Sequence, residues 1–224
     1  MTSIEDLTRL APPPPGPAPI DWRAVEDTLG MTLPDDYKRL AGAYGPGAFC
    51  DFVRVYHPHG PTEWVDLTGP MPARLRRQLL KDRDSGTYSM PHPPENLFAI
   101  GVTDNGNHLF WVTDPAADPD AWRLTVNEPD GHDWYTYDGD LTEFLVSALS
   151  GRTRVPVFPD RLLDGGVFFT PSRPTGSNHQ PDRPSAPASI SGQAVREWAR
   201  ANGYDVPDHG RIPARIIQAW QQDQ

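Results

Sequence analysis

The sequence predicts an α+β fold in which two helices precede a run of antiparallel strands and another helix follows it. Apolar residues recur at helical spacing within residues 21–45 and again within 139–151, on either side of the β-prone middle of the chain. In that middle, two β-prone segments flank Asn105-Gly106, a pair that suits the tight turn of an antiparallel hairpin. Helices and strands separated along the chain in this way define the α+β class.

Each of these three helices has recognisable terminal residues. Asp21 can cap the first helix, and Gly30 can end it in a left-handed conformation. Pro34 suits the first turn of the second helix, and Asp140 with Glu143 forms a capping-box pattern at the third. The apolar faces comprise Trp22, Val25 and Leu29; then Tyr37, Leu40, Ala41 and Tyr44; and finally Leu141, Phe144, Leu145, Ala148 and Leu149.

The remaining elements of the body follow from β propensity and alternation. Aromatic and β-branched residues favour strands, and alternating apolar residues indicate a strand with one buried face. The elements expected on these grounds are a strand within 49–58, a polar helix over 71–83, the hairpin within 96–114, and strands within 121–128 and 133–139.

Composition divides the chain into four parts. Hydrophobic residues make up 37% of the sequence, and its 7 Trp, 7 Tyr and 8 Phe are enough for one core. The 27 prolines among 224 residues belong mainly in linkers and tails, because helices and central strands exclude proline. We therefore expect a proline-rich arm over 1–19, an α+β body over 20–170, a disordered linker over 171–188 and a helical module over 189–224.

The arm and the linker are predicted from their proline content. Residues 11–19 are a polyproline tract, expected as an extended spacer, with a ligand for an SH3-type domain as the alternative. Residues 171–188 contain no large apolar side chain and no periodicity. Residues 152–170 are apolar enough to pack back on the body.

The net charge of −10 is unevenly distributed. The first 165 residues carry −11, residues 166–188 carry +1, and residues 189–224 are neutral. An acidic body disfavours broad affinity for nucleic acid and favours a basic protein partner, with solubility alone as the simpler interpretation.

A reducing, cytoplasmic location is expected. Cys50 is the single cysteine, so an intrachain disulfide cannot form. The N-terminus lacks the basic start and apolar run of a signal peptide, and no stretch approaches the ~18 apolar residues of a membrane span.

The sequence favours a protein without enzymatic activity. It contains no Walker loop, no glycine-rich dinucleotide fingerprint and no Gly-x-Ser-x-Gly elbow. Cys50 is expected as a buried strand thiol because nothing points to an activating base. His57-Pro58-His59 could offer two imidazoles to a metal, but the absence of nearby ligands favours an ordinary loop. We expect no catalytic residue, metal or cofactor.

The strongest candidate site is a loop near the C-terminus, in the segment DHGRIPARIIQAW. Gly210 permits a close approach of the backbone, and Arg211 beside it could enter a narrow, A·T-rich minor groove. Two short predicted helices flank the loop. Their cations could contact phosphates, namely Arg196, Arg200 and Arg215.

A structural alternative exists for the same arginine. Arg211 could pair with Asp208 or Asp205 and only solvate a turn. Spacing alone does not decide between pairing and groove insertion.

The C-terminal segment resembles the DNA-binding domain of the actinobacterial Lsr family of histone-like nucleoid-structuring proteins. The resemblance is carried by REWARANGY and GRIPARIIQAW. It implies readout of A·T-rich minor grooves by an Arg-Gly-Arg loop, of which Gly210 and Arg211 match and His209 replaces the first arginine. A weaker resemblance, to the peripheral subunit-binding domain of 2-oxo acid dehydrogenase complexes, implies docking on protein.

The body resembles the SUKH superfamily, which contains yeast cell-wall-synthesis regulators and many bacterial immunity proteins. WRAVEDTLGMTLPDDYKRLAGAYGPGAF, LFAIGVTDNGNHLFWVTDP and GDLTEFLVSALSG carry this resemblance. It implies an α+β domain with a bent antiparallel sheet and flanking helices, and a role in binding proteins.

Together these observations predict a non-enzymatic cytoplasmic protein of the nucleoid. Its tail is expected to bind A·T-rich double-stranded DNA, and its acidic body a basic protein. Two alternatives remain: an immunity protein, or antitoxin, that neutralises a basic secreted toxin such as a nuclease, and an adaptor whose tail docks on protein.

Overall fold

The computed structural model describes residues 3–86, 89–128 and 133–172, together with Trp198 and Asn202. The chain divides into two units, residues 1–177 and residues 178–224. All the elements named below belong to the first unit. In the second unit, Trp198 lies in a helix and its carbonyl oxygen accepts the Asn202 N–H at 2.9 Å, as in a helical turn. The rest of the expected two-helix module lies outside the described residues.

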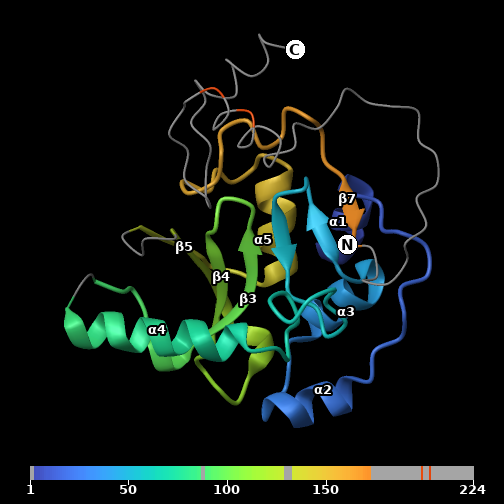
Figure 1. Ribbon diagram of the computed structural model, residues 1–224. Coiled ribbons are helices and arrows are strands. Elements are labelled where there is room, and N and C mark those ends of the chain that lie inside the picture. Colours follow the sequence, from blue (N-terminus) through green and yellow to red (C-terminus); the bar gives the residue numbers. More distant parts are fainter. Residues whose placement is uncertain (1–2, 87–88, 129–132, 173–197, 199–201, 203–224) are drawn as a thin grey trace. The chain divides into compact units, whose positions relative to one another are not determined.

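The first unit is an α+β domain, as predicted (Figure 1). Five α-helices and two short 3-10 helices accompany seven strands in the part of the chain that is described. The α-helices are α1 (Ser3–Leu10), α2 (Trp22–Leu29), α3 (Asp35–Tyr44), α4 (Met71–Ser85) and α5 (Leu141–Leu149). The strands are β1 (Gly47–Phe49), β2 (Val53–Val55), β3 (Leu97–Thr103), β4 (His108–Val112), β5 (Arg123–Asn127), β6 (Trp134–Tyr137) and β7 (Phe169–Pro171).

All seven strands form one antiparallel sheet in the order β6-β5-β4-β3-β2-β1-β7. The predicted hairpin is confirmed: β3 and β4 are joined by a turn in which Gly106 has a φ of 90°. β7 returns from the end of the body to pair with β1. This pairing needs glycine at position 47, because a Cβ there would lie 2.2 Å from the Phe169 ring.

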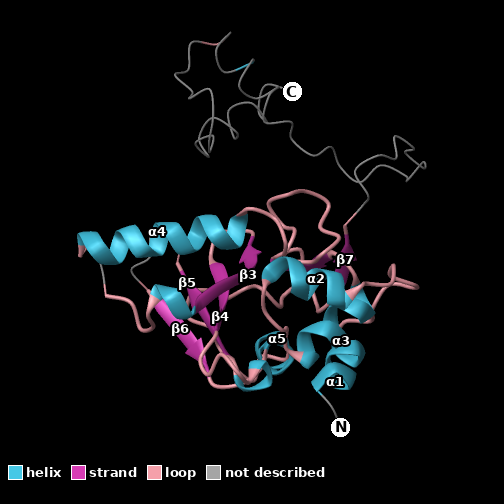
Figure 2. Cartoon of the chain, turned by 90° about the horizontal axis from the view of Figure 1, so that it is seen from below, coloured by secondary structure: helices cyan, strands magenta, loops and turns pink. Residues whose placement is uncertain are grey.

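Helices cover both faces of the sheet (Figure 2). α4 lies on one side, while α1, α3 and α5 lie on the other. On the side covered by α1, α3 and α5, the Tyr37 ring of α3 packs edge to face against the Trp111 ring of β4, with the ring centroids 5.2 Å apart. The buried Tyr37 hydroxyl donates to the Tyr56 carbonyl oxygen at 2.8 Å, which satisfies it inside the core.

Most helix ends follow the sequence prediction, although Pro34 occupies the N-cap position just before α3 and not its first turn. The Asp21 carboxylate accepts the Ala24 N–H at 3.2 Å, and the Asp140 carboxylate accepts the Glu143 N–H at 2.7 Å. Gly30 ends α2 with a left-handed φ of 67°. Each of these interactions joins residues three or four positions apart, so a suitable cap residue in the local sequence is enough to predict it.

The single strand expected within residues 49–58 is wrong, because the segment folds into a hairpin. Cys50 and Asp51 have φ values of 52° and 53°, and the Phe52 N–H donates to the Phe49 carbonyl oxygen at 2.9 Å. The reversal lets both phenylalanines of this segment enter the core. Cys50 is consequently a half-buried turn residue and not a strand thiol, and burial raises its pKa, which disfavours the thiolate.

The N-terminal residues also differ from the expected arm over 1–19. Residues Ser3–Leu10 form α1, which packs against α5 and α3. Leu7 and Ala11 are fully buried, and the Tyr44 hydroxyl donates to the Ala11 carbonyl oxygen at 2.6 Å. The body therefore begins before residue 20. The physical reason is the amphipathic spacing of α1, which supplies an apolar face that the rest of the domain buries.

Candidate functional site

Carboxylates gather at one end of the sheet, which we call the acidic end. The β4–β5 connection (113–122) and the β6–α5 connection (138–140) emerge at this same end because neighbouring strands are antiparallel. The start of α3 joins them, since the Asp35 N–H donates to the Asp120 carboxylate at 2.7 Å. The acidic end consists of Asp35, Asp36, Asp114, Asp118, Asp120, Asp138, Asp140 and Glu143.

Most of these carboxylates are exposed and uncompensated. Of the eight, only Asp35 forms an ion pair within the described residues, with Lys38 at 3.8 Å. Residues 101–150 contain ten carboxylates and one arginine, so much of the body's negative charge lies in this part of the chain. Such a surface attracts cationic groups and raises their rate of encounter.

A buried carboxylate joins two helices at the acidic end. Asp36 is 5% exposed, and its Oδ2 accepts the N–H and the hydroxyl of Thr142 at 3.0 and 3.2 Å. These bonds satisfy donors at the N-terminus of α5 from the neighbouring helix α3. Burial, followed by the negative charge of Asp140, raises the pKa of Asp36 to about 6. Asp36 therefore ties α3 to the first turn of α5 at the acidic end.

An open cleft of about 430 Å³ lies beside these loops. Its walls come from the α2–α3 connection, the β4–β5 connection and α4. Met31 and Trp122 give it apolar surface, while Thr113 and Arg76 give it polar groups. The cleft could accept a side chain of a partner that docks on the acidic end.

His57 behaves as a buried core residue and His59 as a loop residue. His57 Nδ1 accepts the His59 N–H at 2.9 Å, so the proton is on Nε2, which lies 3.3 Å from the Ala41 carbonyl oxygen. Burial lowers the pKa of His57 to about 4. Over the described ranges, no group of three His, Cys, Asp or Glu residues could hold a metal ion.

The predicted DNA-contacting residues lie outside the described residues. This applies to all six, namely Arg196, Arg200, His209, Gly210, Arg211 and Arg215. The alternative partners of Arg211, Asp205 and Asp208, lie outside the described residues as well.

Sequence reasoning did not locate the acidic end, although the signal for it was present. The excess of carboxylates within residues 101–150 is visible in the sequence. Asp35 and Asp36 lie 85 residues or more before their partners, Asp120 in the β4–β5 connection and Thr142 in α5. Their contribution to the acidic end becomes apparent only from the hydrogen bonds.

Fold and surface together define an α+β domain with a prominent acidic end, followed by a separate C-terminal segment. The family model described as SMI1-KNR4 cell-wall matches residues 20–145, more than half of the chain. The chain belongs to this SUKH-type family. The model of the Lsr2 DNA-binding domain matches residues 188–222. The predicted resemblances to the SUKH superfamily and to the Lsr DNA-binding domain are therefore confirmed, and the chain combines a SUKH domain with a DNA-binding domain.

No solved structure matches the chain in the structural comparison. Among the described residues, none of the helices has the length and apolar character needed to cross a membrane.

Proposed function

We propose that this is a non-enzymatic regulatory protein of the bacterial nucleoid, with two binding parts. The C-terminal module binds A·T-rich duplex DNA in the minor groove, and the body binds a basic protein through the acidic end. The observation that carries the DNA-binding part is the match to a DNA-binding domain over residues 188–222, which include Gly210 and Arg211. Guanine amino groups obstruct the minor groove of G·C-rich DNA, so an inserted arginine favours A·T.

Arg211→Ala in the full chain should remove the preference for A·T-rich over G·C-rich duplex, with a roughly tenfold loss on the A·T-rich one. His209→Arg should tighten binding, because it adds a permanent cation beside Gly210. Fluorescence anisotropy with both duplexes measures these effects.

Arg215→Ala is the matched control for Arg211→Ala. Because Arg215 is expected to contact a phosphate, Arg215→Ala should weaken binding to both duplexes equally and make the salt dependence shallower by about 0.9 in log–log slope. If Arg211→Ala keeps the preference and His209→Arg gains nothing, the loop does not read DNA. Docking of the module on protein then becomes the better account.

The acidic end supports a second function, neutralisation of a basic toxin such as a nuclease by the body. Its exposed carboxylates and the adjoining 430 Å³ cleft provide charge and a recess for a partner side chain. An immunity protein would use the same surface as a regulatory adaptor, so one experiment locates the surface for both.

Asp114→Lys combined with Asp118→Lys should slow association of a basic partner recovered by pull-down about tenfold at low salt, through loss of electrostatic steering. Stopped-flow or surface-plasmon kinetics measure the rate. Asp104→Lys is the control, since this exposed residue lies in the β3–β4 turn at the opposite end of the sheet. Equal slowing by Asp104→Lys would place the partner elsewhere, and an association rate independent of salt would show that electrostatic steering is the wrong account.

A further inference from the structure

α4 carries positive charge in a body that is otherwise strongly acidic. Residues 71–81 contain four cations and no carboxylate, whereas the first 165 residues carry a net charge of −11. Neither the acidic end nor the C-terminal module explains this concentration of like charges.

The packing of α4 holds three of these cations toward solvent. Leu79 and Pro72 are buried on the side that faces the sheet, with Leu75 partly buried beside them. The exposed side carries what we call the basic face of α4: Arg74, Arg77 and Lys81. Their spacing of three and then four residues places neighbouring Cβ atoms about 5–6 Å apart along one side of the helix.

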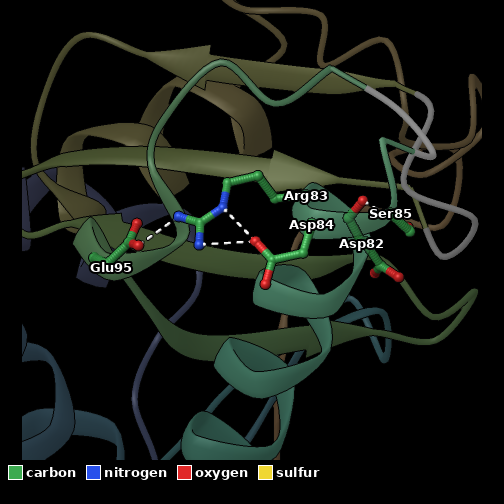
Figure 3. Close-up of polar contacts among 5 residues, drawn as sticks. All are labelled: Asp82, Arg83, Asp84, Ser85 and Glu95. Atoms are coloured by element: carbon green, nitrogen blue, oxygen red, sulfur yellow. Dashed lines mark hydrogen bonds and ion pairs between the residues drawn. The ribbon is translucent and has the colours of Figure 1, made fainter.

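The other cations of α4 have partners within the protein. Arg83 forms ion pairs with Asp84, at 3.1 Å, and with Glu95 (Figure 3). Arg76 donates from Nε to the Leu97 carbonyl oxygen at 3.2 Å. These contacts lie near the C-terminus of the helix and near the sheet, and not on the basic face.

The basic face lacks such neutralisation. In the part of the chain that the structure describes, Arg74, Arg77 and Lys81 form no ion pair. The Arg74 guanidinium instead lies 5.8 Å from the centroid of the Trp64 ring, and this tryptophan is 48% exposed. A cation over an aromatic ring keeps its charge while its position is restrained.

We propose that the basic face of α4 contacts the phosphate backbone of the DNA duplex bound by the C-terminal module. This inference rests on the proposed DNA binding of that module. A row of fixed cations complements the regular negative charge of a duplex, which carries one charge per about 1.7 Å of its axis. The contact positions the body on DNA and reads no sequence.

Charge screening and the tether between the body and the module both favour a weak contact of this kind. The acidic body as a whole repels DNA, but charges beyond a Debye length of about 8 Å are largely screened at physiological salt. Residues 173–187 separate the described body from the matched module and can reach roughly 50 Å when extended. Tethering over such a span corresponds to an effective concentration of about millimolar for a duplex held by the module, which favours even a weak contact by three cations.

The test is the salt dependence of DNA affinity for the full chain. The triple variant Arg74→Ala, Arg77→Ala, Lys81→Ala should bind an A·T-rich duplex with a log–log salt slope shallower by about 2.7, since each phosphate contact contributes about 0.9. The ratio of A·T to G·C affinity should stay unchanged. Alanine favours helix, and circular dichroism checks that α4 is retained.

A second triple variant is the matched control: Arg9→Ala, Arg152→Ala, Arg154→Ala. These arginines are exposed on other parts of the body, and their removal changes the net charge by the same amount. The parent slope should persist in this control. Equal slopes in the parent and the α4 variant, or equal changes in both variants, would overturn the proposal, and an acidic protein would then be the better partner for the basic face.

The Arg211→Ala variant separates this proposal from the DNA binding on which it rests. If Arg211→Ala loses its A·T preference while the α4 variant keeps the parent slope, only the contact by α4 is wrong. If the parent chain binds neither duplex, both proposals fail.

Discussion

Replacing Leu7 with alanine should lower the free energy of unfolding by about 3 kcal/mol, within the ~2–5 kcal/mol typical of large-to-small core substitutions. Leu7 is 0% exposed on α1, between α5 and α3. Alanine would remove buried methyl groups and leave a cavity that the two neighbouring helices can only partly close. Urea denaturation followed by tryptophan fluorescence measures the effect, because several tryptophans lie in this core.

Arg9→Ala on the same helix is the control for Leu7→Ala. Its side chain is 57% exposed and pairs with Asp6 three residues earlier. Surface pairs of this kind contribute little, so the control should stay within about 0.5 kcal/mol of the parent. A loss below about 1 kcal/mol for Leu7→Ala would mean that α1 is not a stable part of the core.

The second large effect should appear in the pH dependence of stability between about pH 4 and pH 6.5. The folded pKa of Asp36 is raised to about 6, so its contribution to stability is full below the unfolded value of ~3.9 and is lost as the pH rises through 6. The folded pKa of His57 is lowered to about 4, so its contribution is full above ~6.5 and is lost as the pH falls through 4. Each change is on the order of 3 kcal/mol.

Because the two effects have opposite signs over nearly the same window, they largely cancel in the unmodified chain. Asp36→Asn keeps an oxygen that can accept from Thr142 and removes the ionisation. Relative to the parent, this variant should gain stability as the pH rises from 4 to 6.5. His57→Gln should show the reverse, with a relative loss of stability over the same rise.

Urea denaturation at half-unit pH intervals measures both differences. Comparing each variant with the parent at the same pH cancels the other titrating groups, including His108, whose pKa is also lowered by burial. Asp104→Asn is a suitable control because this carboxylate is exposed. Parallel pH profiles for the parent and Asp36→Asn would show that the buried carboxylate is not linked to folding.

Local chemistry made several elements predictable. The caps at Asp21 and Asp140, the stop at Gly30 and the turn at Gly106 all appear in the structure where the sequence indicates them. Each depends on a hydrogen bond or a backbone conformation within about four residues. The two family resemblances were also visible in short segments, and both are confirmed.

The errors arose where distant packing determined the conformation. β propensity favoured one strand through Cys50, but burial of Phe49 and Phe52 accompanies a reversal there. Proline content favoured an arm up to residue 19, but the buried side of α1 belongs to the core. Propensity is a weak prior for such segments, because tertiary contacts readily override it.

The candidate sites likewise separate into features that the sequence determines and features that only the tertiary structure determines. The sequence by itself determined the fold class, the acidic character of the body and the presence of Gly210-Arg211 in a DNA-binding module, since these depend on composition and short-range order. Tertiary structure alone decided that Asp35 and Asp36 join the loops near Asp120 and Thr142 in one acidic end. It also decided that Arg74, Arg77 and Lys81 of α4 face solvent together. The physical reason is that charge adds up over space and not along the chain, and only the packing of helices on the sheet brings these residues together.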